Sequence, residues 1–309
     1  MTQTSEPFGS LGAQEQALLD AVGPVWAQDI NRHRDLVVRT YTPLVQQADN
    51  AGIEVLRDQA YGAAPRQRLD VYARAEWQGE RRDVLLFFHG GAFIRGNKSA
   101  NGAIYDNVAY WFARQGCVAV NVEYRLAPDA PYPAGAEDVL AALRWVRQNI
   151  ERFGGDARRI FLMGHSAGGA HVASALLDPA VAGRPRDGEV AGAMLVSARL
   201  RADVLPDNPN AGGVRAYFGA DESLYARRSP ASHVGTSNVP LLVAVAQYEN
   251  PHLDRYGQEF YEAALASART AETRFTSLPR HNHTSIVAHF NSGEETLGPQ
   301  ILQFMRDTR

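Results

Sequence analysis

The chain has 309 residues, of which 45% are hydrophobic and 21% are charged, and its formal net charge is −3. This is the composition of a globular protein, and the slightly acidic balance gives no field that would draw the chain to nucleic acid or to anionic lipid. No run approaches the roughly 18 consecutive apolar residues of a membrane span. Residues 1–12 lack the basic start and apolar core of a secretory signal, so we expect a cytoplasmic protein with no nucleic-acid or membrane partner.

Two residue counts narrow the chemistry further. The single cysteine, Cys117, excludes an intramolecular disulfide, and its apolar neighbours place it in a buried strand. Lys98 is the only lysine among 31 basic residues. Because acidic residues outnumber basic ones, we interpret the arginine bias as genome composition rather than as a phosphate-binding face.

Residues 1–60 differ from the rest of the chain and form the first of two predicted regions. Apolar residues recur at mixed helical spacing over residues 15–30 and 36–52, and Pro24 and Pro43 interrupt them. Because proline breaks helices, we expect two or three short helices. They form either an arm packed on the main domain or a cap over an active site. Residues 61–309 form the second region, the predicted catalytic domain.

From residue 68 onward, short apolar runs alternate with helical segments. The predicted strands are 69–72, 84–88, 117–122, 160–163, 192–197, 241–246 and 274–278. The predicted helices are 103–115, 134–153, 168–177, 254–267 and 294–305. Residues 198–237, rich in Pro, Gly, Asp and Asn, are predicted to leave the sheet as loops and helices. This alternation indicates an α/β fold whose mostly parallel sheet is covered by helices on both faces.

One short motif near the middle of the chain has the residues of a nucleophile site. The apolar run 160–163 leads directly into Gly164-His165-Ser166-Ala167-Gly168, and small helix-compatible residues follow. This strand–turn–helix context is the one in which Gly-x-Ser-x-Gly presents a reactive serine. The glycines permit a tight turn where side chains would collide with the neighbouring strand and helix. We therefore predict Ser166 as a nucleophile.

A second glycine motif follows the predicted strand 84–88. His89-Gly90-Gly91 lets the backbone turn sharply and aim N–H groups into a cavity. Acyl transfer needs such donors, since they stabilise the oxyanion of the tetrahedral intermediate. We assign the oxyanion hole to the N–H groups of Gly90, Gly91 and Ala167, and we expect His89 to brace the loop rather than to react.

Several further motifs occur in a fixed order with these two. They are His-Gly-Gly-Ala-Phe (89–93), Tyr-Arg-Leu-Ala-Pro (124–128), Tyr-Pro-Ala (132–134) with Glu137-Asp138, Gly-Gly-Asp (154–156) and Gly-His-Ser-Ala-Gly-Gly (164–169). In this combination the chain, over about residues 65–305, resembles the hormone-sensitive-lipase-like esterases of the α/β-hydrolase fold and their bacterial relatives near the kynurenine formamidases. The resemblance implies an eight-stranded sheet, a Ser-acid-His triad, no metal and no cofactor. It also implies a structural ion pair between Arg125 and Asp138 and an N-terminal cap.

The general base is expected near the C-terminus, since this fold has the chain order serine, acid, histidine. His283 matches the family position behind the last predicted strand, and His281 is the alternative two residues earlier. We expect His289, His165 and His171 to be structural.

The acid is expected after the predicted strand 241–246. The resembled family most often has an aspartate there, whereas this chain has Glu249. A glutamate can replace it, because any carboxylate bonded to the imidazole fixes its tautomer and stabilises the imidazolium. Asp254 is the alternative, although an aspartate at that position also suits the start of a helix.

Together these residues predict a serine hydrolase that cleaves carboxylic esters of small to medium acyl groups. Phe93, Ile94 and the N-terminal helices are candidate pocket walls, because substrate clefts are mostly apolar. An amidase or arylformamidase would use the same triad, and a receptor that binds a small ligand without catalysis is the third interpretation. The sequence leaves a homodimer open. The expected partner is a small-molecule ester or amide.

Overall fold

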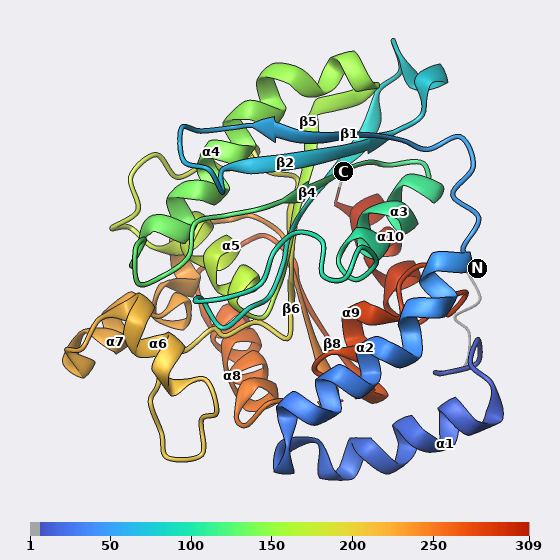
Figure 1. Cartoon of the computed structure of the whole chain (residues 1–309). Helices are drawn as coiled ribbons and strands as arrows, with labels where there is room; N and C mark the ends of the chain where they lie inside the picture. The colour runs from blue at the N-terminus through green and yellow to red at the C-terminus, as the bar shows by residue number, and fades with distance from the viewer. Residues whose placement is uncertain (1–6, 309) are drawn as a thin grey trace.

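An eight-stranded sheet forms the centre of the computed structural model, which describes residues 7–308 (Figure 1). The strands are β1 (Glu54–Ala60), β2 (Arg68–Ala73), β3 (Arg82–Phe88), β4 (Val118–Val122), β5 (Gly155–His165), β6 (Gly192–Val196), β7 (Leu241–Tyr248) and β8 (Thr273–Asn282). They lie in the order β1-β2-β4-β3-β5-β6-β7-β8. β2 is antiparallel to both of its neighbours, and all pairs from β4 to β8 are parallel. The predicted eight-stranded, mostly parallel α/β sheet is therefore confirmed.

Helices cover both faces of this sheet. On one face lie α4 (Ala134–Asn149), α5 (Ala167–Leu177) and α8 (Leu253–Ala266), and on the other lie α3 (Asp106–Arg114), the short α9 (Ser285–Ala288) and α10 (Leu297–Asp307). Each face has its own hydrophobic core. In β3, Val84, Leu86 and Phe88 pack toward α4 and α5, whereas Leu85 and Phe87 pack toward α3 and α10. This is the period-two alternation of a strand buried on both sides.

A long excursion separates β6 from β7, as predicted. It contains α6 (Ala211–Phe218), η4 (Glu222–Leu224), α7 (Tyr225–Arg228) and η5 (Pro230–Thr236). Further 3-10 turns are η2 (Ala75–Trp77) and η3 (Ile150–Phe153), the latter directly after α4. Figure 1 shows α6 and α7 on one flank of the molecule, opposite the N-terminal helices.

The N-terminal region forms α1 (Ala13–Val22), η1 (Gly23–Gln28) and α2 (Ile30–Gln47). The helix changes character at Pro24, as expected, but the predicted break at Pro43 is wrong because α2 continues through it. A proline inside a helix costs about 3 kcal/mol. The buried stripe of α2 offsets that cost; its members, spaced by four residues, are His33, Val37, Tyr41 and Val45.

β1 was not predicted, and it lies within the region assigned to the N-terminal segment. It pairs with β2 and so belongs to the main sheet, which means that the helical part ends at Gln47. The strand is mostly exposed and carries charged and polar side chains. An edge strand of this kind lacks the hydrophobic alternation from which strands are predicted. None of the helices within residues 7–308 is long and apolar enough to cross a bilayer.

Candidate active site

Ser166 stands at the sharp turn between β5 and α5. Its backbone has φ +56° and ψ −116°, a conformation that costs a residue with a side chain of order 1–3 kcal/mol. A Cβ on Gly164 would lie 2.5 Å from the carbonyl oxygen of Gly168, and one on Gly168 would collide with the carbonyls of Phe88 and His89. The two glycines are therefore required by close packing, and they hold Ser166 at the carboxyl end of a central strand.

The structure brings three of the predicted site residues into one hydrogen-bonded line. His283 Nε2 lies 3.1 Å from Ser166 Oγ, and His283 Nδ1 lies 2.6 Å from Glu249 Oε2. Because the carboxylate accepts the proton on Nδ1, Nε2 is left to accept the serine hydroxyl proton. All three side chains are nearly buried, with residue exposures of 7–9%.

The alternative residues lie elsewhere. Asp254 is exposed in the first turn of α8 and has no hydrogen bond to His283. His281 is fully buried and pairs with Glu294, with its Nε2 2.8 Å from Glu294 Oε1. Within residues 7–308, neither Asp254 nor His281 makes a contact that would orient it toward Ser166.

Glu249 is held by donors on its other carboxylate oxygen. The Ala246 backbone N–H donates to Oε1 at 2.9 Å, and the Ser197 hydroxyl donates to the same atom. Ser197 directly follows β6 and, like Ser166, has a positive φ. Sequence analysis missed it, although a polar residue at the carboxyl end of a parallel strand is a recognisable signal for this type of fold.

His165 fixes the loop that carries His283. Its Nε2–H donates to the His283 carbonyl at 2.9 Å, and its Nδ1 lies 3.3 Å from the Tyr105 hydroxyl. Burial, and then the neighbouring His283 ring, hold the pKa of His165 well below its usual value. His165 is therefore a neutral donor and has the structural role expected for it.

The predicted oxyanion glycines lie beside the serine. A Cβ on Gly90 would stand 3.2 Å from the Ser166 Cβ, and Gly91 has φ +153°, so both positions need glycine. The N–H groups of Gly90, Gly91 and Ala167 donate to no backbone carbonyl within residues 7–308. Burial raises the pKa of the neighbouring Tyr105 to about 12.

Two supports lie behind the site. His89 Nδ1 is 2.7 Å from the Gly90 carbonyl oxygen, and its ring stacks on Tyr124 with centroids 4.3 Å apart, so it braces the loop as expected. Arg125 pairs with the fully buried Asp138 at 2.8 Å, which is the ion pair that the resemblance implied.

A cavity of about 80 Å³ opens at Ser166 and His283. Its walls include Trp26, Ile30 and Arg34, so the N-terminal helices form part of the wall of the site. Phe93 and Ile94, predicted as pocket walls, are not among its lining residues. Phe93 is 1% exposed and its ring stacks on Tyr217 at 4.8 Å, which makes it a core residue in this structure.

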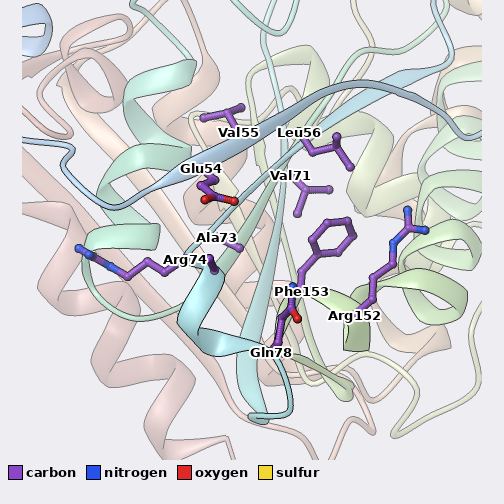
Figure 2. Close-up of a pocket in the computed structure, with 10 residues that line it drawn as sticks. Glu54, Val55, Leu56, Val71, Ala73, Arg74, Gln78, Arg152 and Phe153 are labelled. Atoms are coloured by element: carbon purple, nitrogen blue, oxygen red, sulfur yellow. The ribbon is translucent and has the colours of Figure 1, made fainter.

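A larger cavity, of about 390 Å³, lies away from the serine, at the β1 edge of the sheet. Figure 2 shows Val71 and Phe153 lying close together in it, with Arg74 and Arg152 on opposite sides. Ser166, His283 and Glu249 are not among the residues that line it.

One group within residues 7–308 has metal-ligating side chains close together. Ligand atoms of His281, His289 and Glu294 lie within 4.8 Å of one another. The Thr296 hydroxyl, however, lies 3.3, 3.0 and 3.3 Å from these three groups, and His281 already bonds Glu294. The group is thus a hydrogen-bonded network whose centre is filled by a hydroxyl.

A family model described as alpha/beta hydrolase fold matches residues 85–284, which is about two thirds of the chain. The chain belongs to the α/β-hydrolase fold family. The match spans the oxyanion glycines, the serine turn, Glu249 and His283.

Curated relatives match this α/β-hydrolase over about a third of its length. An esterase, LipC, of Mycobacterium tuberculosis is 38% identical over 110 residues, 35% of this chain and 26% of the relative. Carboxylesterase NlhH of the same species is 42% identical over 103 residues, 32% of this chain and 31% of the relative. The gibberellin receptor GID1 of rice is 43% identical over 104 residues, 32% of this chain and 29% of the relative. The matched part thus spans about a quarter to a third of each relative.

Solved structures match nearly the whole chain. Esterase B of Lactobacillus rhamnosis has a TM-score of 0.71 at 19% identity and covers 96% of both chains. A hyperthermophilic esterase of the archaeon Pyrobaculum calidifontis has a TM-score of 0.69 at 22% identity, with 96% of this chain and 97% of the other covered. At these identities the likeness shows a shared fold.

Proposed function

We propose that this α/β-hydrolase is a serine hydrolase that cleaves carboxylic esters of small to medium acyl groups through an acyl-enzyme intermediate. The observation that carries the proposal is the line Ser166 Oγ, His283 Nε2 and Nδ1, Glu249 Oε2, with separations of 3.1 and 2.6 Å. Nucleophile, base and orienting carboxylate within hydrogen-bond reach are the requirements for covalent acyl transfer.

In the first half-reaction, His283 Nε2 takes the Ser166 hydroxyl proton as Oγ attacks the ester carbonyl carbon. The carbonyl oxygen becomes an oxyanion, and the N–H groups of Gly90, Gly91 and Ala167 stabilise it. Glu249 stabilises the imidazolium that forms. The C–O bond to the alcohol then breaks, and the Nε2 proton passes to the leaving oxygen.

Water completes the cycle. His283 Nε2 removes a proton from a water molecule that attacks the acyl carbon, a second oxyanion forms in the same place, and the bond to Ser166 Oγ breaks as Oγ regains the proton. The products are the carboxylic acid and the free serine. Every step uses side chains and backbone groups of this chain.

The cavity volume favours small acyl groups. A volume of about 80 Å³ equals the share of roughly three liquid water molecules. Drug-sized ligands occupy pockets of about 300–1,000 Å³. A short acyl group such as acetyl therefore suits the site better than a long one.

The names of the relatives also favour ester hydrolysis, since two of them are an esterase and a carboxylesterase. A receptor is among them as well, so similarity in this segment does not separate catalysis from binding. The complete line of Ser166, His283 and Glu249 favours catalysis.

A cytoplasmic location remains part of the proposal.

The test is hydrolysis of 4-nitrophenyl acetate, butyrate and octanoate, and of 4-nitroacetanilide and N-formylaniline, by the protein and by Ser166→Ala. We expect turnover of the short esters, falling with chain length, and a loss of about 10³-fold or more in kcat for the variant. Product release is measured by absorbance.

Faster turnover of the anilide or the formyl compound would mean that the protein is an amidase or arylformamidase that uses the same mechanism. Absence of turnover for all substrates would contradict the enzyme proposal and favour the receptor interpretation. Activity that persists in Ser166→Ala would exclude Ser166 as the nucleophile.

A further inference from the structure

The cavity at Ser166 is lined by two arginines and by no acidic side chain. Arg34 comes from α2 and Arg95 from the loop that follows the oxyanion glycines. The one carboxylate of the catalytic line, Glu249, lies behind His283 with its side chain 2% exposed, and it is not among the lining residues. The proposed mechanism uses neither arginine.

Arg95 is attached firmly to the oxyanion loop. Its backbone N–H donates to the Gly91 carbonyl at 3.0 Å, so its Cα is fixed relative to the site of oxyanion formation. Its guanidinium has one recorded partner, the Asn210 side-chain oxygen at 3.4 Å. It has no carboxylate partner within residues 7–308, which leaves most of its five donors available.

Arg34 faces the same cavity from the N-terminal helices. Its Nε and Nη2 donate to Asp35 and its Nη1 donates to Asn31, at 2.8–3.2 Å. Asp35 is well exposed, with 56% of its side chain accessible, and an exposed ion pair of this kind contributes little energy. Arg34 can therefore retain its neighbour or turn its donors toward a ligand at small cost.

The two cations repel each other across the opening. Burial, and then the charge of Arg34, lower the pKa of Arg95. Both arginines also oppose the raised pKa of Tyr105, whose ring lines the cavity beside them. No acidic side chain lines the cavity between Arg34 and Arg95. An anion bound there would therefore lower the electrostatic repulsion between them.

We propose that the substrate of this site is an ester that carries a carboxylate, held by Arg34 and Arg95 while Ser166 attacks its ester carbonyl. The inference rests on the proposed hydrolase function and names its substrate class. Arginine suits the role, because its planar donors match a carboxylate and remain charged at any relevant pH.

The test compares similar esters with and without a carboxylate. One pair, 4-acetoxybenzoate and its methyl ester, carries the charge on the alcohol side. The other, 4-nitrophenyl hemiglutarate and 4-nitrophenyl valerate, carries it on the acyl side. We expect kcat/KM to be at least 10-fold higher for the anionic member of one pair. That preference should fall at least 10-fold in Arg95→Gln and clearly in Arg34→Gln. Arg39→Gln, an exposed change on the same helix, should leave it intact.

A binding measurement separates this inference from the hydrolase proposal. Calorimetry with Ser166→Ala should show tighter binding of 4-acetoxybenzoate than of its methyl ester, and the difference should vanish when Arg95→Gln is added. Turnover of neutral esters with no anion preference would overturn the carboxylate inference and leave the hydrolase standing. Selective binding of the anionic ester without any turnover would support the carboxylate inference and overturn the hydrolase proposal.

Discussion

At the scale of single residues, contacts favour Glu249 as the acid of the proposed triad. Glu249 offers one carboxylate oxygen to His283 and holds the other with the Ala246 N–H and the Ser197 hydroxyl. A carboxylate with this set of donors is fixed in place before substrate binds, which is what orientation of the imidazole requires. Asp254 is exposed on α8 and takes no part in this arrangement.

We therefore predict different results from two neutralising substitutions. Glu249→Gln should lower kcat for a short ester by about 10²–10⁴-fold, since the amide cannot stabilise the imidazolium and can favour the wrong tautomer. Asp254→Asn should change kcat by less than about two-fold. The measurement is steady-state hydrolysis of 4-nitrophenyl acetate at neutral pH.

Asp254→Asn is the matched control, because it makes the same chemical change in the first turn of the neighbouring helix. A larger loss in Asp254→Asn than in Glu249→Gln would move the acid to α8. Retention of full activity by both variants would show that neither carboxylate orients the base.

The residues of this line could be selected from the sequence because each belongs to a local pattern. Ser166 follows a strand inside a glycine motif, and His283 and Glu249 each follow a predicted strand. Ser197, Arg34 and Arg95 lie in no such pattern. Their contribution depends on which distant segments the fold brings to the opening, as when α2 and the oxyanion loop place two guanidinium groups at one cavity.

At the scale of secondary-structure elements, the N-terminal helices are attached to the segment beside Glu249 and to Glu294. Trp26 Nε1–H in η1 donates to the Asn250 side chain at 2.9 Å, one residue beyond Glu249. The Tyr41 hydroxyl in α2 donates at 3.0 Å to Glu294, which in turn bonds His281 at the end of β8. The segment is thus connected to the residue after Glu249 and, through Glu294, to the end of β8 just before His283.

We predict that Tyr41→Phe weakens this attachment. Glu294 is fully buried, and its bond with His281 helps to lower its pKa to about 2 against the opposing effect of burial. A hydrogen bond to a buried charge contributes about 1.5–3 kcal/mol. The free energy of unfolding, measured in urea, should fall by that amount.

Tyr110→Phe is the control for this substitution. Tyr110 is partly buried and its ring packs edge-on against Tyr72, but no hydrogen bond of its hydroxyl is recorded within residues 7–308. Its removal should change the free energy of unfolding by no more than about 0.5 kcal/mol. Equal losses in the two variants would mean that the hydrogen bond from Tyr41 to Glu294 adds nothing to the free energy of unfolding.

The elements that sequence analysis misjudged were those whose formation depends on tertiary contacts. β1 is mostly exposed and polar, and it exists because β2 offers it an edge. α2 passes through Pro43 because its buried stripe packs over α9, beside which it lies in Figure 1. The strands β3 to β7 were predictable since burial on both faces gives each of them an apolar run.

At the scale of the whole molecule, several buried histidines make stability depend on pH. Burial lowers the pKa of His89 and of His171 to about 3 and that of His289 to about 4. His165 is lowered well below its usual value for the same main reason. In the unfolded chain these groups titrate near pH 6.5.

The direction of the effect follows from proton counts. As the pH falls below about 6.5, the unfolded state binds protons on these histidines while the folded state does not. Each histidine therefore lowers the free energy of unfolding by about 1.4 kcal/mol per pH unit until its folded pKa is reached. We predict a steep loss of stability between pH 6.5 and 4, measured as the urea midpoint at a series of pH values.

His171 offers a test of whether buried histidines cause the acid sensitivity, because neither of its ring nitrogens has a hydrogen-bond partner within residues 7–308. His171→Leu removes one titrating group, so the stability difference between pH 7.5 and pH 5 should shrink by about 2 kcal/mol. Val172→Ala, a buried change at the next residue of α5, should lower stability equally at both pH values and leave the difference unchanged. An unaltered difference in His171→Leu would mean that His171 also binds its proton in the folded protein and contributes nothing to the acid sensitivity.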